Sequence, residues 1–172
     1  MPSYTHLAYR RNAEAAARNQ QIKKPKNLES LAKARDDFGY FCDYVADKPP
    51  AYHHKEWNRK FVTNEDSSCL IKIAGPNIDL LAPRGSAKST VLGLLTAWAI
   101  GIHTQAGLPL QVLYLSYTVD IARSKSATIK RIIESKRYQE VFPKVRLLKN
   151  VTSNEYWSID HKFAGIDTTG EE

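Results

Sequence analysis

Residues 82–90 of the chain read Ala82-Pro83-Arg84-Gly85-Ser86-Ala87-Lys88-Ser89-Thr90. This segment follows the G-x-x-x-x-G-K-[ST] spacing of phosphate-binding loops, with Ala82 and Ala87 in place of the two glycines. Small residues let a phosphate chain approach consecutive backbone N–H groups, and a helix that begins at Lys88 would direct its free N–H groups at the same anion. The segment therefore predicts a nucleotide-phosphate-binding turn. The alternative is a tight strand–helix turn that carries an incidental lysine.

The residue types in this turn suggest separate roles. Lys88 would supply a point charge to the β and γ phosphates of ATP, and the Ser89 hydroxyl would be a ligand of Mg²⁺. Arg84 would reach the γ-phosphate or sense its loss, unless it is a surface arginine paired with a carboxylate. Lys88 and Arg84 are the catalytic candidates. The predicted nucleotide-binding residues of the turn are Ala82, Pro83, Arg84, Gly85, Ser86, Ala87, Lys88, Ser89 and Thr90.

The sequence on both sides of the turn predicts alternating strands and helices. A short strand is expected over 77–81, a helix that is apolar on nearly all sides over 88–102, and a second strand over 111–116. The continuous apolar run of the second strand is typical of a parallel strand covered on both faces. The expected fold class is α/β, an incomplete P-loop NTPase with a parallel sheet, preceded by an N-terminal helical segment.

Apolar spacing and stop signals predict the remaining elements. Helices are expected over about 27–46, 53–62 and 119–136, with a short one before Pro143. The last expected element is a hairpin of 156–159 with 162–166.

Composition limits the class of protein. The 172 residues carry a net charge of +7 and are 42% hydrophobic, which is typical of a globular chain and suggests an acidic partner such as nucleic acid. Two cysteines, Cys42 and Cys69, exclude a disulfide scaffold and a C-x-x-C metal site, and we expect both to be buried thiols. The apolar run 91–102 is too short for a membrane span and is expected to be a core helix.

Two segments are strongly basic. Residues 1–37 are interpreted as a basic helical arm or linker, either solvated or in contact with DNA or another subunit. On the helix 119–136 and after it, a basic face would be either solvated or a track for the DNA backbone. The basic residues of this second region are Arg123, Lys125, Lys130, Arg131, Lys136, Arg137, Lys144, Arg146 and Lys149.

The segment 80–90 resembles the Walker A segment of tailed-phage terminase large subunits. Upstream, 49–57 is similar to the family's segment that lies against the adenine, so His54 and Trp57 would border the base; ordinary packing is the alternative. Downstream, 112–118 is similar to the family's second strand. The similarity covers roughly residues 38–170, and the turn is its most specific part.

The resemblance implies an ATPase motor, RecA-like and ASCE-type, that couples ATP hydrolysis to translocation of double-stranded DNA into a procapsid. Its implied cofactors are ATP and Mg²⁺. Its implied partners are DNA, the portal protein and a small terminase subunit, with the full-length protein forming a homo-oligomeric ring in the host cell cytoplasm. The family also carries an endonuclease domain after the ATPase domain.

The chain departs from the family where a Walker B strand should end in Asp-Glu. Asp160, Asp167, Glu171 and Glu172 do not fit that pattern. Residues 38–172 are therefore expected to be a truncated N-terminal part of the ATPase domain, which binds nucleotide weakly and hydrolyses it negligibly. A helicase-like P-loop ATPase fragment, or a non-catalytic basic protein that binds DNA or capsid, are the alternative functions.

Overall fold

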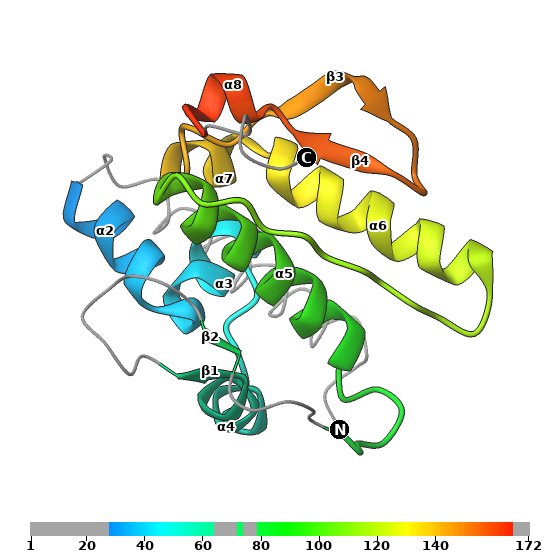
Figure 1. Cartoon of the computed structure of the whole chain (residues 1–172). Helices are drawn as coiled ribbons and strands as arrows, with labels where there is room; N and C mark the ends of the chain where they lie inside the picture. Colours follow the sequence, from blue (N-terminus) through cyan, green and yellow to red (C-terminus); the bar gives the residue numbers. More distant parts are fainter. Residues whose placement is uncertain (1–27, 64–71, 74–78, 167–172) are drawn as a thin grey trace, which may run out of the picture.

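The computed structural model describes residues 28–63, 72–73 and 79–166, and this part of the chain is mostly helical (Figure 1). The elements in chain order are α2 (Leu28–Asp36), α3 (Phe38–Ala46), α4 (Tyr52–Phe61), β1 (Val62–Thr63), β2 (Lys72–Ile73), α5 (Lys88–Gln105), α6 (Val119–Glu134), α7 (Lys136–Val141), β3 (Leu147–Thr152), β4 (Trp157–Ile159) and α8 (His161–Ala164).

The core lies around α5, which α3 and α6 flank (Figure 1). Burial of its side chains confirms the prediction of an apolar core helix over 88–102. The Trp98 indole N–H donates to the Ala34 carbonyl at 3.1 Å, and the buried Tyr138 hydroxyl donates to the Ala97 carbonyl at 2.8 Å. These bonds tie α5 to α2 and α7, since a buried polar group needs a partner.

The single helix expected over 27–46 is wrong, because the chain breaks at Asp37. The Asp37 side chain accepts a hydrogen bond from the Tyr40 N–H at 3.1 Å and caps α3. A short carboxylate that bonds nearby backbone favours such a start over a helix interior. The Arg35 guanidinium donates to the Val141 carbonyl at 2.8 Å, which joins α2 to α7. The domain boundary predicted at residue 37 coincides with this cap and stays a prediction.

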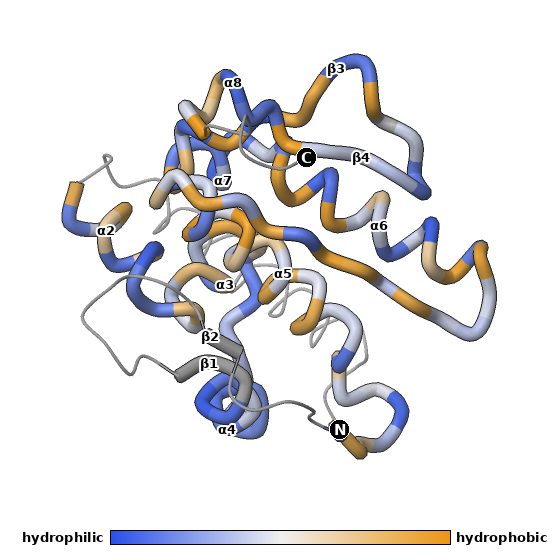
Figure 2. Tube along the Cα trace, viewed as in Figure 1, coloured by the Kyte–Doolittle hydropathy of each residue, from blue (hydrophilic) through white to orange (hydrophobic). Residues whose placement is uncertain are grey.

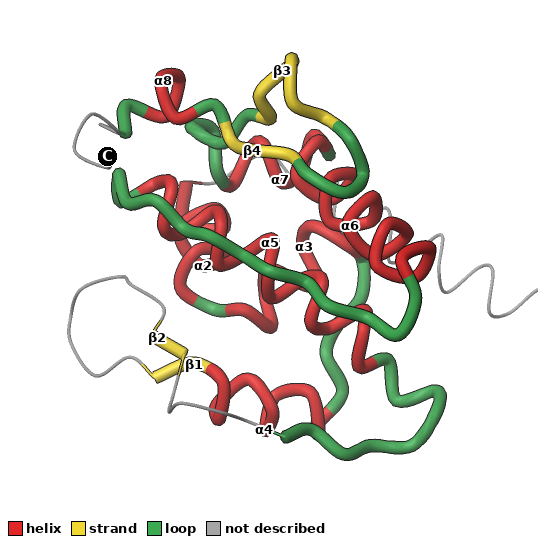
Figure 3. Tube along the Cα trace, turned by 45° about the vertical axis from the view of Figure 1, so that its right-hand side comes forward, coloured by secondary structure: helices red, strands yellow, loops and turns green. Residues whose placement is uncertain are grey.

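The predicted α/β fold with a RecA-like parallel sheet is contradicted. The strands of the described part form two separate antiparallel pairs, β1–β2 and β3–β4. Residues 111–116 and 79–81 form no strand, and 77–78 lie outside the described residues. Figures 2 and 3 show the stretch between α5 and α6 as an extended, largely apolar strip that passes over α5.

The physical reason lies in the partners that a strand needs. A parallel strand is held by neighbouring strands and covered on both faces. Within the described residues, the segment 111–116 has no such neighbour, and Leu113 and Leu115 are 82% and 79% exposed. The prediction of a covered parallel strand over 111–116 is therefore wrong, because the pairing of such a strand depends on other segments.

The hairpin expected from 156–159 and 162–166 is also wrong. β4 pairs instead with β3, with Leu147 opposite Ile159 and Thr152 opposite Trp157. The Asp160 carboxylate accepts a hydrogen bond from the Phe163 N–H at 2.9 Å and begins α8. The capping aspartate therefore turns the chain into a helix, where the hydrophobic pattern alone had indicated a strand.

The other helix predictions are confirmed within a few residues: 53–62 as α4, 119–136 as α6, and the short helix before Pro143 as α7. Cys42 is a buried free thiol, as expected, whereas Cys69 lies outside the described residues. Among the helices described, none combines the length and apolarity that crossing a bilayer requires.

Candidate phosphate-binding site

The turn before α5 has an unusual backbone. Gly85 has φ 84°, and Ala87 has φ 57° and ψ 22°, so both are left-handed. Between them, the Ser86 hydroxyl and N–H donate to the Pro83 carbonyl at 2.8 and 3.4 Å. Ala87 precedes α5 and has no side-chain cap bond, and the first N–H groups of a helix find no acceptor within the helix. The N–H groups of Lys88 and Ser89 are therefore suited to donate hydrogen bonds to an anion.

The Lys88 ammonium bonds to the residues that begin its own turn. Its Nζ donates to the Ala82 carbonyl and to the Pro83 carbonyl, the latter at 3.2 Å. Because these carbonyls begin the turn and Lys88 ends it, the charged group lies across the turn. This places a cation beside the helix N-terminus, and the role of Lys88 toward phosphate stays a prediction.

His54 contacts the same turn from α4. Its Nε2 lies 2.9 Å from the Ser86 carbonyl, and its Nδ1 accepts from the Ala51 N–H at 3.2 Å. The Trp57 ring packs at 5.1 Å from the His54 ring, centroid to centroid. The two residues predicted to border the adenine therefore lie side by side. One of them, His54, contacts Ser86, which lies 32 residues later in the sequence.

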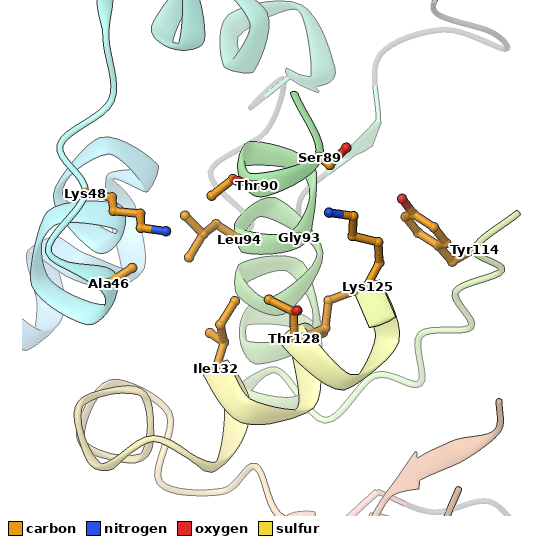
Figure 4. Close-up of a pocket in the computed structure, with 11 residues that line it drawn as sticks. Ala46, Lys48, Ser89, Thr90, Gly93, Leu94, Tyr114, Lys125, Thr128 and Ile132 are labelled. Atoms are coloured by element: carbon orange, nitrogen blue, oxygen red, sulfur yellow. The ribbon is translucent and has the colours of Figure 1, made fainter. Parts of the chain in front are cut away.

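Ser89 and Thr90 lie beside a cavity between α5 and α6, of about 200 Å³. Figure 4 shows the ammonium ends of Lys48 and Lys125 directed toward α5 from opposite sides. His54 and Lys88 do not line this cavity. Its lining residues are Ala46, Lys48, Ser89, Thr90, Gly93, Leu94, Tyr114, Lys125, Thr128, Ile129 and Ile132.

The structure therefore separates the predicted site residues into two groups. His54, Ser86 and Lys88 meet at the turn, while Ser89 and Thr90 face the cavity. Arg84 is exposed, and its catalytic role stays a prediction.

Sequence reasoning assigned Lys125 to a basic face of α6 and did not place it beside Ser89. The signal was present, because Lys125 lies four residues before the buried Ile129 and so shares its face of the helix. Lys48, Tyr114 and Thr128 carried no comparable signal.

The basic face predicted on α6 is partly neutralised by its own neighbours. Arg123 is paired with Glu155 and with Asp120, the latter at 3.5 Å. Beyond α6, the Arg137 guanidinium donates to the Asp47 carboxylate at 2.6 Å. These pairs leave fewer charges for a DNA backbone than the sequence count suggests.

The turn fits a phosphate group better than it fits Mg²⁺. In the described ranges, no three His, Cys, Asp or Glu side chains gather to hold a metal ion. Ser89 alone would be a protein ligand, so the phosphate oxygens and water would complete the Mg²⁺ shell. Asp160 is engaged as the cap of α8, and the other Walker B candidates, Asp167, Glu171 and Glu172, lie outside the described residues.

Comparison of the chain with protein-family models, with curated proteins and with solved structures finds no match.

Proposed function

We propose that this chain is the ATP-binding part of a DNA-packaging motor of the terminase type. The observation that supports it best is the turn itself: two left-handed residues lead directly into an 18-residue helix, with Lys88 at its first position. Successive backbone N–H groups in such a turn, a helix N-terminus and a lysine together favour a phosphate chain.

The chemistry assigned to each group follows from its position. The N–H groups of Lys88 and Ser89 would donate to phosphate oxygens, and Lys88 would exchange its two carbonyl acceptors for the β and γ phosphates. Bound ATP with Mg²⁺ would bring the γ-phosphoryl group that the motor transfers to water. Because Asp160, Asp167, Glu171 and Glu172 do not fit a Walker B pattern, we expect negligible hydrolysis by this chain alone.

The assignment to a terminase rests on the resemblance of 80–90 and 49–57 to that family. The contact between His54 and Ser86 supports it, because it brings these two segments together. Double-stranded DNA, a portal protein and a small terminase subunit are the proposed partners, and the host cytoplasm is the proposed location. A parallel sheet is no part of the proposal.

The test is Mg-ATP binding by the wild type and by Lys88→Ala, measured by calorimetry or with a fluorescent ATP analogue. Lys162→Ala, which removes an exposed lysine of α8, is the matched control. Loss of a charge-assisted contact should weaken binding of Lys88→Ala roughly 10- to 100-fold, with no change for the control. Equal affinity in all three proteins would overturn the proposal. Salt-dependent DNA binding without any nucleotide response would instead favour a non-catalytic DNA-binding protein.

A further inference from the structure

Both ring nitrogens of His54 are engaged at the N-terminal end of α4. The Ala51 N–H donates to Nδ1 at 3.2 Å, so Nδ1 carries no proton. In the neutral imidazole the proton then lies on Nε2, which is 2.9 Å from the Ser86 carbonyl and donates to it. The two contacts therefore select one tautomer and direct one donor at the phosphate-binding turn.

That donor sets the orientation of one peptide unit. In a trans peptide the carbonyl and the following N–H point in opposite directions, and the described chain holds no cis peptide bond. Because the Ser86 carbonyl faces His54 on α4, the Ala87 N–H faces away from α4. In the turn, an N–H oriented in this way is available to an anion on that opposite side.

The hydrogen bonds of Ser86 inside the turn are made by its N–H and hydroxyl and leave its carbonyl to His54. The Ser86 N–H and hydroxyl both bond to Pro83 within the turn. A Cβ added to Gly85 would meet nothing within 4 Å, so no neighbouring group packs there. The His54 ring is itself held by the rings of His53 and Trp57, whose centroids lie 4.0 and 5.1 Å away.

We propose that His54 is a positioning residue, which holds the Ser86–Ala87 peptide with its N–H turned toward the bound phosphate. This rests on the proposed nucleotide binding and deepens it. The sequence resemblance placed His54 beside the adenine, whereas the geometry gives its ring a role toward the phosphate groups. His54 contacts neither reacting atoms nor metal in this role and acts through the backbone of the turn.

Two near-isosteric substitutions separate the two contacts of the ring. In His54→Asn, the amide oxygen can take the place of Nδ1 and accept from Ala51, but the side chain is too short to reach Ser86. In His54→Gln, the terminal amide reaches the place of Nε2 and can donate to Ser86. His54→Ala removes both contacts, and Lys55→Gln changes an exposed neighbour on the same helix.

Affinity for a fluorescent ATP analogue, measured with Mg²⁺ present, is the first readout. Loss of the hydrogen bond to Ser86, which both variants share, should weaken binding roughly 2- to 10-fold in His54→Ala and His54→Asn. His54→Gln and Lys55→Gln should stay within about twofold of the wild type. If His54→Asn keeps the wild-type affinity while His54→Gln loses affinity, the ring stabilises only the N-terminal end of α4 and the proposal is wrong. Equal affinity in all variants would also contradict the proposal.

Amide hydrogen exchange over residues 82–91 is the second readout, measured without nucleotide. The N–H groups of Ser86, Thr90 and Val91 bond within the turn and report its order. Exchange should be faster in Ala and Asn variants than in Gln and wild type. If the wild type binds no nucleotide, the proposed function is wrong, but the exchange rates of the variants still test the positioning role of His54. Equal exchange in all four proteins would refute the positioning role.

Discussion

Gly101 of α5 lies against the ring of Phe142, so closely that a Cβ atom on Gly101 would lie 2.4 Å from the ring's Cδ2. Phe142 is fully buried next to Phe41 and Tyr138. The close approach of the helix backbone to this ring therefore requires a residue without a side chain. It explains why a glycine, which disfavours helix, lies inside the longest helix of the described chain.

The first prediction concerns this contact. Gly101→Ala should lower the free energy of unfolding by about 1–3 kcal/mol, because the ring cannot move away within a packed core. Gly93→Ala is the matched control on the same helix: there the nearest atom to an added Cβ lies at 3.8 Å, an ordinary contact. The higher helix propensity of alanine should make that variant neutral or slightly more stable. Urea denaturation measures both, and equal effects would contradict the packing argument.

A second prediction concerns the backbone of the turn 82–90. Ala87 is left-handed, a conformation that costs an alanine roughly 1–2 kcal/mol and a glycine much less. Ala87→Gly should therefore leave stability unchanged or raise it, by up to about 1 kcal/mol after the entropy of the unfolded glycine is counted. Ala106→Gly is the control, because Ala106 has φ −78° and gains no relief. Thermal unfolding should show a lower midpoint for Ala106→Gly alone; the opposite ranking would speak against a strained Ala87.

A third prediction follows from Cys42. Burial, with Asp37 and Asp43 nearby, raises the pKa of its thiol to about 12 from an ordinary value of 9.0. Between these values the unfolded chain releases a proton that the folded chain retains, so this group's stabilisation is complete below pH 9 and falls as pH rises toward 12. Wild-type stability should therefore fall more steeply between pH 8 and pH 10.5 than that of Cys42→Ala, by on the order of 1–2 kcal/mol. Parallel urea curves at both pH values provide the measurement, and identical pH slopes would count against the buried neutral thiol.

Local signals predicted most of the helices. α6 follows apolar residues at spacings of three and four, and α5 is a long apolar run, so both helices are encoded within a few turns of chain. Asp37 and Asp160 show where local reasoning was incomplete, since each is a side-chain cap that redirects the backbone in spite of the surrounding hydrophobic pattern.

Non-local pairing could not be predicted in the same way. The extended segment 111–116 has the composition of a buried strand, but a sheet requires neighbours from elsewhere in the sequence. The same difference between local and non-local features applies to the candidate site. Lys88 and the turn were visible as a motif, whereas the contact between His54 and Ser86 depends on how α4 lies against the turn.

In the proposed function, the two carbonyl bonds of Lys88 would make phosphate binding a competition between an internal and an external ligand. The Ala82 and Pro83 carbonyls take two of the three N–H donors of the ammonium, so they compete with phosphate oxygens for it. The measured affinity would then be the difference between two sets of hydrogen bonds, and smaller than the attraction of a free lysine for a phosphate. The released carbonyls of Ala82 and Pro83 would need water or a new donor, so the start of the turn would rearrange together with its end.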